Sequence, residues 1–136
     1  MLEFRLLQYG RVRLQVLPGE LAVARLDPAD PIPGWAVQQP ISSITRTREE
    51  LSIVCEAATV PADIRSARGW RCLRVAGSLD FSLTGVLAAI ATPLAEARVS
   101  IFAISTYDTD YFLVRTESLR LAIERLTAAG HEVVEE

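Results

Sequence analysis

Hydrophobic positions follow a helix period and then a strand period within Leu79 to Val114, the stretch around which the chain is organised. The predicted helix carries apolar residues three or four positions apart on one face: Val86, Leu87, Ile90, Leu94 and Ala97. The pattern then changes, because strand-forming residues crowd the run from Val99 to Ser105. The polar residues 105–110 separate this predicted strand from an apolar strand at Asp110 to Arg115.

The predicted helix begins near Ser82, whose hydroxyl is suited to capping the first N–H groups. Pro93 lies inside it and cannot donate to the carbonyl of Ala89, so we expect a kink or a short 3₁₀ stretch there. A second helix is predicted from a cap at Thr116 through Ala129, and Gly130 ends it. Its expected buried stripe comprises Leu119, Ala122, Ile123 and Leu126.

With strands predicted at Trp70 to Ala76 and His131 to Val134, the second half has the order β-α-β-β-α-β. This order is that of the split ferredoxin-like unit. The predicted fold class is therefore α/β (α+β), with antiparallel sheets covered by helices on one face.

The first half repeats this order with parts missing. Val12, Leu14 and Val16 alternate with polar residues, which predicts a half-exposed strand. Further strands are predicted at Leu21 to Leu26, Ile41 to Thr47, and Glu50 to Ala57. Asp27 to Trp35 contains three prolines, so it replaces the first helix with a connection and at most one helical turn.

The polar stretch Pro61 to Gly69 ends in glycine and is predicted to link the two halves. The predicted division is a degenerate N-terminal unit at residues 1–64 and a complete C-terminal unit at residues 65–136.

Composition bounds the function classes. A chain of 136 residues with 50% hydrophobic residues can bury a core without a metal or disulfide. The net charge of -3 argues against nucleic acid as a partner. No apolar run approaches the roughly 20 residues that span a membrane, and the charged start of the chain does not resemble a signal peptide. We expect a cytoplasmic protein.

Few residues are suited to catalysis. All 14 basic residues are arginine, which excludes a lysine Schiff base. Cys55 and Cys72 lie in apolar strands and are expected to be buried free thiols, with a disulfide between them as the alternative. The single histidine, His131, is expected to cap the preceding helix with its ring. We expect neither a metal site, nor a cofactor, nor an enzymatic activity.

Several motifs resemble the ACT-domain family. Thr84 to Ala91, followed by Leu94 to Ala97 and Val99 to Ile101, is similar to the glycine, small-residue helix and strand of that pattern. Gly77 to Phe81, Ser105 to Tyr111 and Glu50 to Cys55 resemble small bacterial tandem-ACT proteins, which are related to the ACT repeats of the eukaryotic cytosolic arginine sensors. The resemblance implies a regulatory module that binds an amino acid at an interface between ACT units.

A free amino acid needs one partner for its carboxylate and another for its ammonium. A helix N-terminus favours an anion, and a residue without a side chain lets a ligand approach the backbone closely. The N–H groups of Thr84, Gly85 and Val86 are therefore candidates for carboxylate binding. The alternative is that Gly85 only permits close packing of the strand against the helix.

The polar hexapeptide contains candidates for the ammonium. In an extended backbone, Asp108 and Asp110 point to opposite faces, so one of them can face a cleft. The resemblance implies that Asp110 and the backbone around Thr106 and Tyr107 contact the ligand. The alternative is that Asp108 and Thr109 form a hairpin turn and that Asp110 bonds local N–H groups.

Two functions follow. The first is a non-catalytic sensor that binds an amino-acid effector. Such a sensor can form a homodimer, and it acts on a regulated protein. The second is a protein-interaction or structural module without a small-molecule ligand, whose sheet edges pair with a partner.

Overall fold

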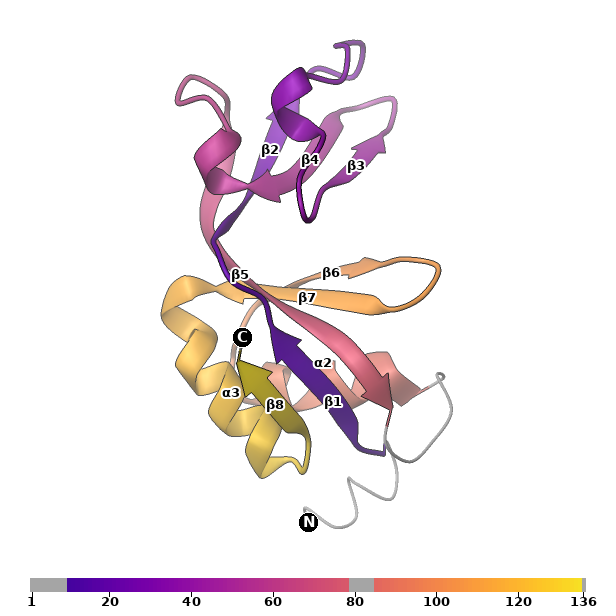
Figure 1. Cartoon of the computed structure of the whole chain (residues 1–136), viewed down its shortest axis with the longest axis vertical. Coiled ribbons are helices and arrows are strands. Elements are labelled where there is room, and N and C mark those ends of the chain that lie inside the picture. The colour runs from indigo at the N-terminus through magenta and orange to yellow at the C-terminus, as the bar shows by residue number, and fades with distance from the viewer. Residues whose placement is uncertain (1–9, 79–84, 136) are drawn as a thin grey trace. The chain divides into compact units, whose positions relative to one another are not determined.

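The computed structural model describes residues 10–78 and 85–135. Two compact units make up the chain, and each has its own hydrophobic core. The larger unit comprises Met1–Pro18 and Arg71–Glu136, and the smaller unit comprises Gly19–Trp70 (Figure 1). Strand β5 (Ser66–Ser78) contributes residues to both units.

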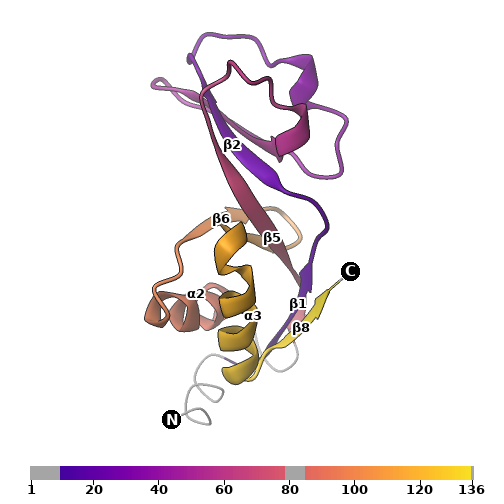
Figure 2. The ribbon, with the colours of Figure 1, turned by 90° about the vertical axis from the view of Figure 1, so that its left-hand side faces the viewer.

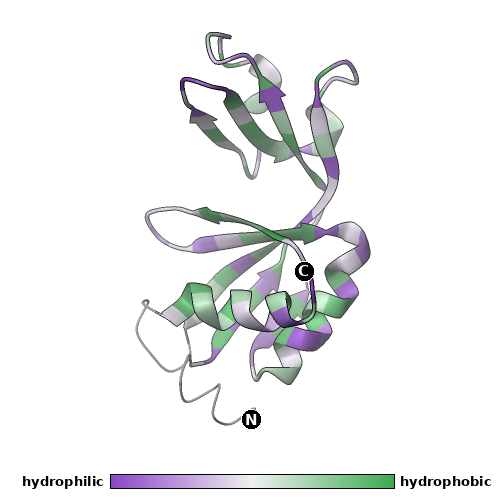
Figure 3. Cartoon of the chain, turned by 180° about the vertical axis from the view of Figure 1, so that it is seen from behind, coloured by the Kyte–Doolittle hydropathy of each residue, from purple (hydrophilic) through white to green (hydrophobic). Residues whose placement is uncertain are grey.

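The larger unit contains the predicted β-α-β-β-α-β order. After β5 come α2 (Val86–Glu96), β6 (Ile101–Ser105), β7 (Asp110–Arg115), the 3₁₀ turn η4 (Thr116–Ser118), α3 (Leu119–Ala128) and β8 (Glu132–Glu135). Both helices lie on one face of the sheet, as expected (Figures 2 and 3). Their buried residues, among them Ile90, Leu94 and Leu126, pack with the core residues of the strands.

Strand β1 (Val12–Val16) belongs to the larger unit, which the sequence-based division at residue 64 does not anticipate. The strand lies between β5 and β8, so the strand order is β6-β7-β5-β1-β8. It pairs antiparallel with β5 and parallel with β8, and the expectation of purely antiparallel sheets is wrong for the second pair. Alternation predicts that residues 12–16 form a strand, but it does not identify the partner of that strand.

The smaller unit is a ferredoxin-like unit whose helices are reduced to single turns. It contains β2 (Leu21–Leu26), η1 (Gly34–Ala36), β3 (Ser43–Arg46), β4 (Leu51–Glu56), η2 (Ala57–Thr59) and the first residues of β5. Its strand order is β3-β4-β2-β5. The predicted strands and the degenerate first helix are confirmed. The predicted linker is wrong at its end, because Ser66 and Ala67 already pair with β2.

Gln39 supplies hydrogen bonds that hold the two short turns together. Its Nε2 donates to the Trp35 carbonyl at 2.6 Å and to Thr59 Oγ1 at 2.9 Å. Its Oε1 accepts from the backbone N–H of Glu56 at 2.8 Å. One side chain thus joins η1, β4 and η2.

Helix α2 departs from its prediction in the residues that it buries. The described helix begins at Val86, and the predicted cap at Ser82 lies outside the described residues. Leu87, predicted on the buried face, is 54% exposed, and Ala89 and Pro93 are buried instead. The α-helix continues through Pro93, so the predicted 3₁₀ stretch is absent from it.

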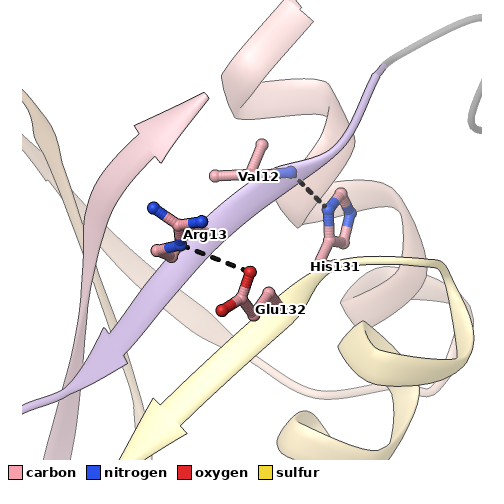
Figure 4. A network of polar contacts seen from close by, with 4 residues as sticks. All are labelled: Val12, Arg13, His131 and Glu132. Atoms are coloured by element: carbon pink, nitrogen blue, oxygen red, sulfur yellow. Dashed lines mark hydrogen bonds and ion pairs between the residues drawn. The ribbon is translucent and has the colours of Figure 1, made fainter. Parts of the chain in front are cut away.

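The carbonyl of Ala89 takes its donor from another part of the chain. Pro93 has no N–H to offer it, and Nε2 of the buried His131 lies 2.8 Å away. The other ring nitrogen, Nδ1, accepts from the backbone N–H of Val12 at 3.0 Å (Figure 4). A single side chain therefore connects α2 with β1.

The prediction that the His131 ring caps α3 is wrong. The backbone N–H of His131 makes that contact instead, donating to the Leu126 carbonyl at 3.0 Å. Gly130, with φ of 99°, ends the helix as predicted. At the other end, the 3₁₀ turn η4 precedes α3, and Ser118 rather than Thr116 lies at the N-cap position.

Both cysteines are free and buried, and they lie in different units. Burial raises the pKa of the Cys72 thiol to about 12, so this thiol is un-ionised at neutral pH. The expectation of buried free thiols is confirmed.

Replacing His131 with alanine leaves the buried N–H of Val12 and the carbonyl of Ala89 without their partner. We expect the free energy of unfolding to fall by about 2–4 kcal/mol, because each unpaired buried group costs about 1–3 kcal/mol. Urea denaturation at neutral pH measures this loss.

The same replacement in a Pro93→Ala variant isolates the contact between the His131 ring and α2. Pro93→Ala returns an N–H that can donate to the Ala89 carbonyl, so His131→Ala is expected to cost about 1 kcal/mol less in that background. An equal cost in both backgrounds would show that the ring does not satisfy this carbonyl.

Candidate functional site

The two predicted parts of the site lie at the same end of the larger unit. The β6–β7 hairpin turn and the start of α2 lie on the same side of this unit in opposite views (Figures 1 and 3). Val86 is the first residue of α2, and Gly85 lies directly before it. Thr84 lies outside the described residues.

The polar hexapeptide forms a hairpin turn that Thr106 closes. The backbone N–H and the hydroxyl of Thr106 both donate to the Thr109 carbonyl, at 2.8 and 3.0 Å. The N–H of Thr109 donates back to Thr106 Oγ1 at 3.3 Å. The hairpin turn of that alternative is therefore confirmed, and the turn itself uses the N–H of Thr106. The bonds from Asp110 to local N–H groups stay a prediction.

Thr109, which lies between Asp108 and Asp110, has a structural role that the sequence analysis does not predict. Its hydroxyl donates to the carbonyl of Val75 in β5 at 2.7 Å, which fixes the turn against the adjacent strand. No local signal distinguishes it from Thr106, because both are threonines in a polar run. The contact depends on the pairing of β7 with β5.

The two aspartates differ in their surroundings. Asp108 is exposed in the turn, beside the fully exposed Tyr107. Asp110 is half-buried as the first residue of β7 and pairs in register with Ser105. Asp110 is thus held by the sheet, whereas Asp108 lies outside it.

The start of α2 is suited to a negatively charged ligand. Its first turn carries no acidic residue, so the positive end of the helix dipole is not offset there. Gly85 has φ of -95°, which any residue adopts, so backbone conformation does not require glycine at this position. What glycine provides is the absence of a side chain beside the first N–H groups.

The residues that the structure describes contain no group of three His, Cys, Asp or Glu side chains that could hold a metal ion. No described helix is long and apolar enough to cross a membrane.

A hollow of about 460 Å³ in the smaller unit lies among Gly19, Glu20, Glu56, Ala57, Ala58 and Arg68. The guanidinium of Arg68 donates to the carbonyls of Ala57 and Val60, at 2.7 and 2.8 Å. Arg68 therefore has a structural role beside η2.

Comparison with known proteins identifies the family. The family model of the ACT domain matches residues 65–128, and a second model, described as an N-terminal domain, matches residues 19–63. A crystal structure of an Agobacterium tumefaciens protein is 39% identical, covers 93% of this chain and 94% of its own, and superposes with a TM-score of 0.88. The chain belongs to the ACT-domain family.

This ACT protein is related to the eukaryotic arginine sensors. The human protein named cytosolic arginine sensor for mTORC1 subunit 1 is 38% identical over 84 residues. That alignment covers 56% of this chain and 26% of the sensor, so the chain spans about a quarter of its length. The regulatory subunit of aspartate kinase from Thermus thermophilus shares the fold, with a TM-score of 0.58 at 9% identity over 86% of this chain and 97% of its own.

Thr109→Val keeps the shape of the side chain but removes the hydroxyl that donates to Val75. We expect it to lower the free energy of unfolding by about 1 kcal/mol. Asp108→Asn, at the exposed turn, is expected to change it by less than about 0.5 kcal/mol. Urea denaturation of both variants tests the contact, and equally small effects would contradict it.

Proposed function

We propose that this ACT protein is a non-catalytic sensor that binds a free amino acid where α2 begins in the larger unit. One observation carries the proposal. At one end of the ACT unit, the start of α2 has no acidic residue in its first turn, and it lies on the same side as the β6–β7 turn. Asp108 lies in that turn, and Asp110 begins the strand after it. The first feature suits the carboxylate of an amino acid and the second suits its ammonium group. ACT domains as a family are regulatory modules of this kind.

In this proposal, the ligand carboxylate accepts hydrogen bonds from the N–H groups of Thr84, Gly85 and Val86. The helix dipole adds to the attraction, and the missing side chain of Gly85 allows close approach. Asp110 is the partner of the ammonium or guanidinium group. The sheet holds this residue in place, so its carboxylate is positioned before the ligand arrives. Asp108 and the backbone of Tyr107 complete this side, and Thr106 keeps the turn closed.

We further propose that another ACT unit, from a second copy of the chain or from a regulated protein, covers this end. Leu87 is 54% exposed in the first turn of α2, and Tyr107 is fully exposed at the hairpin turn. Apolar and aromatic side chains that a monomer leaves exposed are typical of an interface. A ligand bound beneath such an interface would link its own binding to assembly.

The protein should gain stability when its effector binds. A thermal-shift screen of the twenty amino acids, on protein refolded to remove any bound ligand, tests this. A ligand at a hundredfold over its dissociation constant adds about 2.7 kcal/mol and raises the midpoint by roughly 5–15 °C. A shift with one amino acid identifies the effector, and no shift with any of them contradicts the proposed sensor.

Two variants test the location of the site with the effector so identified. Gly85→Val introduces a side chain beside the helix N–H groups, and Asp110→Asn removes a charge; each is expected to weaken binding at least tenfold. Asp63→Asn, an exposed carboxylate in the smaller unit, is the matched control and should bind normally. Normal binding by both test variants would refute the site while leaving the sensor function intact.

A second function, a protein-interaction module without a ligand, is favoured by strand β6. Within the described residues, β6 pairs only with β7, and its sequence from Ile101 to Ser105 contains no charge. Charged residues commonly protect such an edge from pairing with another chain. Gel filtration of the host lysate with and without amino acids separates the two functions, because a stable complex that ignores amino acids favours the second.

A further inference from the structure

The contacts of His131 determine its protonation state. The N–H of Val12 can only donate, so Nδ1 must be the acceptor and carry no proton. The carbonyl of Ala89 can only accept, so Nε2 must carry the proton. Both contacts are satisfied by one neutral tautomer. In the doubly protonated ring, Nδ1–H would face the N–H of Val12, and two donors cannot bond each other.

We propose that His131 is a pH-sensitive switch for strand β1: the neutral ring holds the start of the strand in the sheet, and protonation releases it. Val12 is the first residue of β1, and the strand lies between β5 and β8. Loss of the contact therefore acts at the end where the strand enters the sheet. This inference rests on the fold and does not depend on the proposed ligand.

Among the described residues, the contacts of the ring offer its added charge no buried counter-ion. The contacts come from Val12 in β1, Ala89 in α2 and Leu126 in α3, and none of these side chains ionises. The titratable side chains on the elements packed against the ring are all exposed: Arg11 and Arg13 at β1, Glu96 in α2, Arg120, Glu124 and Arg125 in α3, and Glu132 and Glu135 in β8. A proton on the ring would therefore be a buried charge that faces no buried acid within residues 10–78 and 85–135.

Burial lowers the pKa of His131 from its ordinary value of 6.5, and the hydrogen bond with Ala89 opposes that shift only in part. The unfolded chain, or the opened strand, thus binds the proton more readily than the closed form. The contribution of the contact is complete above pH 6.5 and is lost as the pH falls toward the lowered pKa of the ring.

A second polar contact nearby joins β1 to β8 and not to α2. Arg13 and Glu132 form an ion pair between β1 and β8 with Nε and Oε2 3.3 Å apart (Figure 4). Both side chains are about half exposed, and an exposed pair contributes little to stability. The pair also does not reach the helix, whereas the ring hydrogen-bonds both β1 and α2, whose apolar side chains share one core.

The chain offers a direct test, because His131 is its single histidine and the imidazole signals are unambiguous. Nitrogen-15 NMR at pH 8 should show the tautomer with the proton on Nε2. Between pH 6.5 and the lowered pKa of the ring, the hydrogen-exchange protection of the Val12 amide and of β1 should fall by up to about tenfold per pH unit, because the opened strand binds the proton and the closed strand does not. Below that pKa, the protection should level off. Amides of β2 and β4 in the smaller unit, which has no histidine, are the internal control.

His131→Gln supplies the matched variant, since it keeps a hydrogen-bonding side chain that does not titrate. The pH-dependent loss of β1 protection relative to β2 and β4 should disappear in this variant, whatever its absolute stability. A wild-type ring protonated on Nδ1 at pH 8 would overturn the proposal. So would protection of β1 that stays constant between pH 6.5 and the lowered pKa of the ring, or that falls equally in the glutamine variant.

Discussion

One hydrogen bond to a backbone carbonyl, that of Ala89 in α2, is the constraint on which the larger unit depends. Pro93 deprives the carbonyl of Ala89 of its helical donor, and a buried carbonyl without a partner is costly. The ring of His131 supplies the donor at 2.8 Å and, with its other nitrogen, accepts from the N–H of Val12. One buried side chain thus satisfies two backbone groups from segments that are 119 and 42 residues away along the chain.

The contact joins α2 to a strand from the N-terminal part of the chain that the sheet of the larger unit contains. In a simple ferredoxin-like unit, the first and fourth strands are neighbours, whereas here β1 lies between β5 and β8. Val12, Leu14 and Val16 are almost completely buried in the core of that unit. The smaller unit is then an insertion between β1 and the rest of the larger unit, and it retains the ferredoxin-like strand order without its helices.

Features that depend on neighbouring residues could be predicted from the sequence. The limits of β2 and β7, the stop at Gly130 and the single turn near Trp35 all follow from local period or backbone chemistry. Partners distant along the chain could not be predicted. The position of β1, the contacts of the His131 ring and the bond from Thr109 to Val75 each join segments that no local pattern connects.

The candidate site is divided in the same way. The sequence indicates the start of α2 and the polar turn separately, and the fold brings both to one end of the larger unit.

The most direct test of an amino-acid sensor is a ¹H–¹⁵N NMR spectrum of refolded protein before and after addition of an equimolar mixture of the twenty amino acids. The account predicts shifts concentrated at Gly85 to Ala88 and Thr106 to Tyr111. Shifts confined to the smaller unit, or none at all, would contradict it.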